Sequence, residues 1–217
     1  MLWLKTFVDL LFENYCLLCG ESSGQNIVCS NCKNDFVIKS NYQKSFKDIT
    51  IYTWGHYDGN LRNGIIALKS GKKRFAQYFA KCLVNFWKEL PDAVRDKQYI
   101  VIPTPSHKQR IKERGYCQTT LIAKDFTDET GLSLSTNSIV RDKRTEYMNS
   151  LNNINERKEN IKDAFQIISP INKENVLIID DILTSGSTLN EIARIIHKHN
   201  PRVNIVGLTV AAGDRYN

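Results

Sequence analysis

The sequence lacks any long apolar run. In 217 residues, no stretch reaches the roughly 18 apolar positions that a membrane-spanning helix needs. The N-terminal stretch 1–15 carries Lys5, Asp9 and Glu13 and lacks a small-residue cleavage site, so it predicts an amphipathic helix and not a signal peptide. We therefore expect a cytoplasmic protein without a transmembrane segment.

Two glycine motifs that bind nucleotides are also absent. The sequence contains neither the Gly-x-x-x-x-Gly-Lys of nucleoside-triphosphate loops nor the Gly-x-Gly-x-x-Gly of dinucleotide-binding turns. With 41% hydrophobic and 24% charged residues, the composition excludes disordered, collagen-like and coiled-coil chains. The 30 Lys and Arg residues outnumber the 23 Asp and Glu residues, and the resulting net charge of +7 favours phosphate-bearing partners, either nucleotides or nucleic acid.

Four of the six cysteines form two closely spaced pairs, Cys16 with Cys19 and Cys29 with Cys32. Two residues between thiolates let both sulfurs of a tight turn reach one ion, and two such turns complete the tetrahedral shell of structural zinc. Redox dithiol chemistry is the alternative, although it usually uses one pair at a helix start. Because four thiolates leave no open coordination position, we expect a zinc ion that folds a short segment and is not catalytic.

Hydrophobic periodicity divides the remaining chain into alternating strands and helices. Because the stretch 40–48 is polar, we expect an N-terminal helix and zinc module over 1–45 and a second domain over 46–217. Alternating strands and helices predict an open, mostly parallel α/β sheet with helices on both faces. The expected strands cover 49–57, 99–103, 176–180 and 204–212, and the expected helices 61–69, 75–90, 119–130 and 192–199. Cys82 lies within one helical pattern, and we expect it in the core.

The stretch 176–188 carries the most chemical information. Its apolar run predicts a buried central strand that ends in Asp180 and Asp181, at the sheet edge where open α/β sheets bind ligands. The following small and hydroxylated residues can surround a monophosphate with N–H groups and hydroxyls, at the positive end of a helix: Thr184, Ser185, Gly186, Ser187 and Thr188. Since carboxylates repel phosphate, we place both acids against sugar hydroxyls or in a Mg²⁺ shell. The alternative is a buried strand followed by a Ser/Thr helix cap.

This stretch, IIDDILTSGST, resembles the signature of the type I phosphoribosyltransferases. The resemblance implies that residues 184–188 bind the 5-phosphate of phosphoribosyl pyrophosphate (PRPP), that Asp180 and Asp181 contact ribose hydroxyls, and that magnesium accompanies PRPP. A four-cysteine module before such a domain is similar to the ComF family of competence proteins, which includes ComFC-like and GntX-like members. The segments 57–71, 101–118 and 151–165 also resemble that family.

The resemblance also assigns a pyrophosphate loop. This loop follows the expected second strand and includes Thr104, Arg110, Arg114 and Gly115. The positive charges in this segment would stabilise pyrophosphate as a leaving group. The chain departs from the family pattern where Cys117 replaces Asn and Met148 replaces Gln, which puts amide-dependent substrate contacts in doubt. We expect Cys117 to be a buried, inert thiol.

Three other clusters of positive charge have open roles. Residues 141–144 and 157–162 lie in a long segment with little periodicity, for which we expect a mobile hood over the site, and a solvated basic loop is the alternative. The run Lys69, Lys72, Lys73 and Arg74 is suited to following a nucleic-acid backbone.

Two functional classes follow. In the first, the protein is a competence protein that binds PRPP, a related phosphosugar or a nucleotide and handles single-stranded DNA, together with other competence or DNA-processing proteins. In the second, it is a Mg²⁺-dependent phosphoribosyltransferase that transfers ribose 5-phosphate from PRPP to a base or amine, by positioning and charge stabilisation without a protein nucleophile. We favour the first class, because the sequence contains a complete phosphate site and no recognisable base-reading site.

Overall fold

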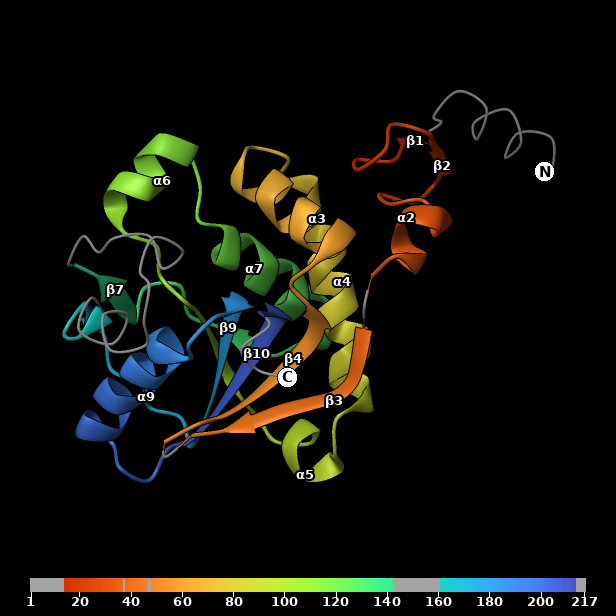
Figure 1. Cartoon of the computed structure of the whole chain (residues 1–217). Helices are drawn as coiled ribbons and strands as arrows, with labels where there is room; N and C mark the ends of the chain where they lie inside the picture. Colours follow the sequence, from red (N-terminus) through yellow and green to blue (C-terminus); the bar gives the residue numbers. More distant parts are fainter. Residues whose placement is uncertain (1–13, 37, 47, 143–160, 214–217) are drawn as a thin grey trace, which may run out of the picture.

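The centre of the computed structural model is a six-stranded sheet. The structure describes residues 14–36, 38–46, 48–142 and 161–213. The strand order is β3-β4-β10-β9-β5-β6, and every neighbouring pair is parallel except the antiparallel pair β3-β4 (Figure 1). The strands are β3 (Ile38–Ser45), β4 (Thr50–His56), β5 (Ile100–Pro103), β6 (Ser133–Leu134), β9 (Asn175–Leu183) and β10 (Asn204–Ala212). The predicted open, mostly parallel sheet is confirmed.

Strand β9 explains why the sheet is buried on both faces. Its side chains alternate between two cores, since Leu177 and Ile179 pack with one cluster and Val176 and Ile178 pack with the other. A strand that is apolar on both faces belongs in the middle of a parallel sheet.

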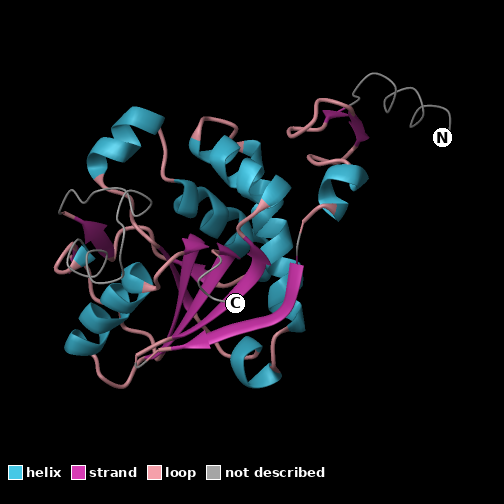
Figure 2. Ribbon diagram, in the orientation of Figure 1, coloured by secondary structure: helices cyan, strands magenta, loops and turns pink. Residues whose placement is uncertain are grey.

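Helices cover both faces (Figure 2). The first core contains residues of α3 (Gly59–Lys69), α4 (Arg74–Glu89) and α7 (Gln118–Thr130). The second core contains one face of α9 (Ser187–His199). These four helices correspond to the expected ones, and α7 ends as predicted at Thr130, followed by Gly131, which adopts a left-handed conformation with φ of +73°. Within the described ranges, no helix is long and apolar enough to cross a bilayer.

The remaining elements are short. The N-terminal part contains β1 (Asn14–Tyr15), β2 (Ser22–Gly24) and α2 (Ser30–Asn34). Helices α5 (Asp92–Arg95) and α6 (Lys108–Arg114) flank β5 along the chain. A separate antiparallel pair is formed by β7 (Ile139–Arg141) and β8 (Phe165–Ile167), and β8 contacts α9.

Two local expectations are wrong. The polar stretch 40–48 is not simply a linker, because β3 pairs with β4 in the central sheet over most of it. An edge strand has one hydrogen-bonded neighbour and needs no apolar run, so its sequence resembled a linker. Residues 108–114, expected as a loop, form α6. The division into residues 1–45 and 46–217 otherwise remains a prediction.

Several expectations fall outside the described residues. They concern Met148, most of the basic segment between β7 and β8, and residues 1–13 of the expected N-terminal helix. The last two residues of that expected helix, Asn14 and Tyr15, form β1 instead.

Candidate functional site

The turn between β9 and α9 presents backbone N–H groups that have no partner in the described part of the chain. Strand β9 ends at Leu183, and α9 begins at Ser187 with Gly186 as its N-cap residue. Among the described residues, no partner accepts a hydrogen bond from the N–H groups of Thr184, Ser185 or Gly186. Since α9 also directs the positive end of its dipole at this turn, the turn can bind an anion.

Gly186 makes this turn possible. Its φ of +71° lies in the left-handed region, and a Cβ atom there would lie 2.5 Å from Cζ of Phe46. Asn190 holds the same residue from the helix side, because its Nδ2 donates to the Gly186 carbonyl at 2.9 Å. The hydroxyls of Ser185 and Ser187 lie 2.8 Å apart and bond each other.

The two acids before the turn have different electrostatic surroundings. Asp180 and Asp181 are both buried. Burial raises the pKa of Asp180 well above its usual range, and the charge of Asp181 raises it further. Burial also raises the pKa of Asp181, but the ammonium of Lys69 at 2.8 Å and a hydrogen bond from Gln118 at 3.3 Å outweigh it, so this pKa is lowered. The pair therefore favours a state with one proton and one negative charge.

Both acids line a cavity of about 310 Å³ at the carboxyl edge of the sheet. Thr184 and Thr188 also line it, together with five cationic side chains, namely Arg62, Lys69, Arg110, Arg114 and Arg141. Since positive groups outnumber the two acids, the cavity attracts anionic ligands.

Three polar side chains that line the cavity have different surroundings. Arg141 is buried and lies over the ring of Phe165, 5.5 Å from its centroid, and burial lowers its pKa to about 10, which leaves it charged at neutral pH. Arg114 donates to Oε1 of Gln118 at 3.1 Å. Thr104 is buried, and its hydroxyl has no hydrogen-bond partner among the described residues. A buried hydroxyl in this position suits a ligand oxygen.

The cavity brings together most of the residues that the sequence singled out. Seven of them line it, from three segments of the chain: Thr104, Arg110, Arg114, Asp180, Asp181, Thr184 and Thr188. Ser185, Gly186 and Ser187 form the adjoining turn. Gly115 does not line the cavity, and it ends α6 with a φ of +78°.

Sequence reasoning missed Arg62 and Gln118 and misplaced Lys69. Lys69 is ion-paired inside the cavity, and its neighbours in the basic run have partners within the protein. Lys72 donates to the Leu17 carbonyl at 2.9 Å, and Arg74 donates to Asn14 Oδ1 at 3.1 Å. The role of this run in following a nucleic-acid backbone remains a prediction. Local sequence patterns do not predict these pairings, because the partners lie 55 and 60 positions away in the chain.

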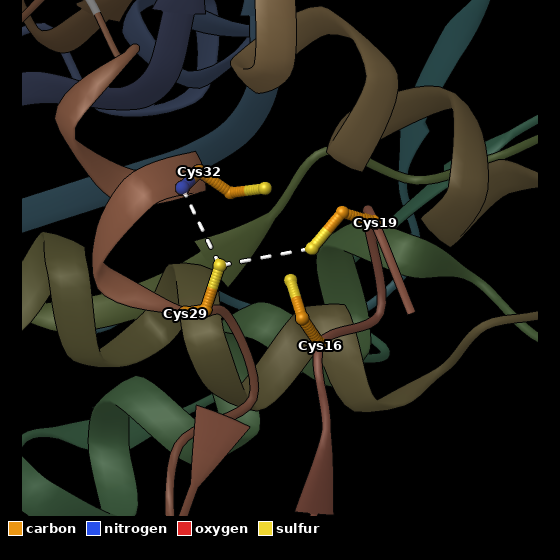
Figure 3. A group of neighbouring side chains, drawn as sticks. All are labelled: Cys16, Cys19, Cys29 and Cys32. Carbon is orange, nitrogen blue, oxygen red and sulfur yellow. Dashed lines mark hydrogen bonds between the residues drawn. The ribbon is translucent and has the colours of Figure 1, made fainter. Parts of the chain in front are cut away.

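The four cysteines of the N-terminal part converge on one point (Figure 3). Their sulfur atoms lie within 4.8 Å of one another, and those of Cys19 and Cys29 are 3.7 Å apart. Sulfurs bound to zinc at 2.3 Å in a tetrahedron would be about 3.8 Å apart, so the cluster fits a zinc ion. Burial raises the pKa of Cys16, but the backbone N–H groups of Cys19 and Cys29 outweigh it and lower the pKa to about 6. Because the pKa values of Cys19 and Cys32 are raised, the assignment of zinc depends on the geometry of the four sulfurs and not on their pKa values.

The cysteine cluster is packed on α3 and α4. Val28 and Phe36 belong to the first core, and the ring of Phe36 meets that of Trp54 edge-on at 6.0 Å. At the start of α3, Nδ2 of Asn60 donates to Oδ2 of Asp35 at 2.9 Å and to the Cys32 carbonyl at 3.3 Å. The cluster thus supports the helix that carries Lys69 into the cavity.

The two remaining cysteines differ in their surroundings. Cys82 packs against the first core as expected, and burial raises its pKa to about 12. Cys117 is half-buried, with its sulfur 3.1 Å from the Thr119 hydroxyl. Burial raises the pKa of Cys117, but hydrogen bonds from Ser106, Thr119 and Thr120 outweigh it, so the pKa is lowered. The expectation of a buried thiol is not met, because Cys117 is only half-buried, and the inertness of this thiol remains a prediction.

The comparisons with known proteins agree with this geometry. Residues 111–216 match the family model described as phosphoribosyl transferase domain. Competence protein F of Haemophilus influenzae is 31% identical over 113 residues, which cover 51% of this chain and 46% of that protein. DNA utilization protein YhgH of Escherichia coli K12 is 27% identical over 108 residues, covering 50% and 44%. Competence protein ComFC of Bacillus subtilis is 22% identical over 206 residues, covering 90% and 76%.

Solved structures resemble the chain more distantly. A hypoxanthine phosphoribosyltransferase of Staphylococcus aureus superimposes with a TM-score of 0.38 and 15% identity, over 70% of this chain and 73% of the enzyme. The matched part of the chain spans less than half the length of Competence protein F and of YhgH.

The sheet, the acid pair and the matching family model define a protein with a domain of the type I phosphoribosyltransferase class. Together with the four-cysteine cluster, the homologues support the expected resemblance more narrowly: the chain is similar to the ComF family of competence proteins.

The cysteine cluster yields a first prediction. Replacing Cys16 and Cys19 by Ser removes two of four thiolates, so we expect the purified protein to lose its zinc and the segment 14–36 to lose its fold. Metal analysis by mass spectrometry and protease sensitivity of the segment measure both effects. Cys82→Ser is the matched control and keeps its zinc. A double variant with the zinc content of the wild type would contradict the assignment.

A second prediction concerns the turn after β9. Gly186→Ala and Gly131→Ala both place a side chain in the left-handed region, which costs roughly 1–2 kcal/mol in each variant. Only the Cβ at position 186 meets another group, the Phe46 ring, whereas nothing lies within 4 Å at position 131. We therefore expect Gly186→Ala to lose more unfolding free energy than Gly131→Ala. We also expect only Gly186→Ala to lose affinity for phosphate. Equal losses in urea denaturation would refute the close approach of Phe46.

Proposed function

We propose that the cavity at the carboxyl edge of the sheet binds PRPP or a closely related phosphosugar or nucleotide. One observation carries this proposal. An anion-binding turn, a buried acid pair and a cationic wall, which come from distant parts of the chain, line the same cavity. These are the groups that a phosphate, a ribose and a pyrophosphate require.

In the proposed complex, each part of the ligand has its own partners. The 5-phosphate lies at the start of α9, where the N–H groups and hydroxyls of residues 184–188 donate to it. Asp180 and Asp181 contact the ribose hydroxyls. The pyrophosphate lies against Arg110, Arg114 and the buried hydroxyl of Thr104, next to the turn at Gly115.

Magnesium would accompany the pyrophosphate of the ligand. The acid pair by itself is a poor cation site, because Oδ2 of Asp181 is already bonded to Lys69 and Gln118. Mg²⁺ also keeps several waters and favours phosphate oxygens, which PRPP supplies.

We further propose that the protein acts in DNA uptake for transformation and handles single-stranded DNA in the cytoplasm, with other competence or DNA-processing proteins as partners. The names of its homologues, Competence protein F, ComFC and DNA utilization protein, support this role. So does the net charge of +7. Helix α6 follows β5 beside the cavity and exposes Lys108 and Lys112, which makes it the first surface to test for contact with the phosphate backbone.

An active phosphoribosyltransferase is the second candidate function. The observation that favours it is the position of Arg110 and Arg114, which line the same cavity as the acid pair and would stabilise pyrophosphate as it leaves. Pyrophosphate release from PRPP with nucleobase or amine acceptors would establish turnover. Binding of PRPP without release across a broad acceptor panel would favour the binding protein.

The acid pair gives the third prediction. Changing Asp180 and Asp181 together to Asn removes the one charged carboxylate of the pair, whose hydrogen bond to ribose is worth about 1.5–3 kcal/mol, so PRPP affinity should fall by at least about tenfold. Calorimetry measures the affinity, and circular dichroism checks the fold. Asp128→Asn, at an exposed position of α7, is the matched control. Unchanged affinity in the double variant would exclude the proposed ribose contacts.

The fourth prediction concerns nucleic acid. The affinity for single-stranded DNA should fall with salt, with a logarithmic slope of about −0.7 for each phosphate contacted. Changing Lys108 and Lys112 to Ala should flatten that slope, whereas Lys88→Ala, which lies near Gln98 just before β5, should leave it unchanged. A flat salt response of the wild type would contradict a role of this basic surface.

A further inference from the structure

Lys69 places a fixed positive charge on the acid pair. It is the last residue of α3, and its Nζ lies 2.8 Å from Oδ2 of Asp181. Gln118 donates to the same oxygen at 3.3 Å. Asp180 turns its Oδ1 toward the backbone N–H of Asp181, at 2.9 Å. One oxygen of the pair is thus bound to an ammonium that belongs to the protein itself.

The end of α3 is held tightly, so the position of Lys69 is built into the fold. The Tyr116 hydroxyl donates to the Leu68 carbonyl and accepts from the N–H of Gly71 at 3.1 Å. In the middle of the helix, Gly64 lies so close to α4 that a Cβ there would be 3.1 Å from the ring of Phe79. Both contacts fix the helix that carries the ammonium.

This arrangement changes how the acid pair can recognise a sugar. Lys69 neutralises Asp181, and the carboxylate of Asp181, which also accepts from the backbone N–H of Ile182, can still accept from a sugar hydroxyl through its remaining lone pairs. Burial favours the protonated form of Asp180, which can both donate to and accept from a second hydroxyl. The positive charge of Lys69 would repel a divalent cation at this point, and few carboxylate oxygens would be available as its ligands.

We propose that Lys69 takes the place of a divalent cation at the acid pair, so that the cavity recognises the ribose 5-phosphate part of its ligand without metal. Mg²⁺ then affects only ligands that also carry pyrophosphate. The inference rests on the proposed function, because it specifies how that same cavity selects its ligand. It makes Lys69 a positioning residue, which acts on the sugar through Asp181.

The test is calorimetric titration with ribose 5-phosphate, once with a chelator and once with Mg²⁺. For the wild type, we expect dissociation constants that agree within about twofold in the two conditions, whereas Mg²⁺ should strengthen the binding of PRPP. Lys69→Met keeps the length of the side chain and removes its charge. We expect this variant to bind ribose 5-phosphate at least about tenfold more weakly in chelator and to recover part of that loss in Mg²⁺.

Two further variants separate positioning from folding. Lys69→Arg keeps the positive charge and should retain metal-independent binding. Lys124→Met removes a charge from an exposed position of α7 and should behave as the wild type does. Thermal unfolding of each variant is measured alongside, and if Lys69→Met does not fold, the metal dependence of the wild type and of Lys69→Arg still decides the matter.

Three outcomes would overturn the inference. If the wild type needs Mg²⁺ to bind ribose 5-phosphate, the proposed PRPP cavity stands and the role of Lys69 is wrong. Lys69 has only a structural role if Lys69→Met binds ribose 5-phosphate in chelator as tightly as the wild type does. The same conclusion follows if Lys69→Met loses affinity that Mg²⁺ does not restore and Lys69→Arg shows the same loss. If neither ribose 5-phosphate nor PRPP binds under any condition, the proposed function itself fails.

Discussion

Parallel pairing of β9 with β5 and β10 is the constraint on which the cavity depends. Because Ile179 is paired with Pro103, the chain after β5 leaves the sheet beside the acids of β9, and the N–H of Thr104 donates to the Ile179 carbonyl at 2.9 Å. Carboxyl ends of parallel strands share one edge, so the turn between β9 and α9 and the cationic side chains line the same cavity there. The antiparallel strand β3 lies at the sheet margin and leaves this arrangement intact.

Helix α3 connects the cysteine cluster to this edge. Asn60 contacts the cluster at the start of the helix, Lys69 meets Asp181 at its end, and Lys72 reaches the Leu17 carbonyl just beyond it. A zinc-bound cluster would therefore also stiffen one wall of the cavity, since metal-binding energy appears as folding energy. Lys72 and Arg74 of the basic run thus join the N-terminal part to the rest of the described chain.

Sequence reasoning succeeded where a structure depends on neighbouring residues and failed where it depends on distant ones. The central strands and long helices were predictable because burial on one or both faces leaves a periodic pattern. Strand β3 and helix α6 were not, since an edge strand and a short solvent-exposed helix need little apolar surface. Within the site, the turn at Gly186 follows from local spacing, but the reason for glycine there, the approach of Phe46, comes from a segment far away in the chain.

The sequence by itself determined the two cysteine pairs and the acid pair with the turn that follows it, because each consists of residues a few positions apart whose spacing sets their geometry. Only the tertiary structure decided which cations face that pair. Lys69 comes from α3, Arg114 from the end of α6 and Arg141 from β7, and no spacing links them to Asp181. Their electrostatic effect depends on distance through space and on burial, and both arise only when the helices pack against the sheet.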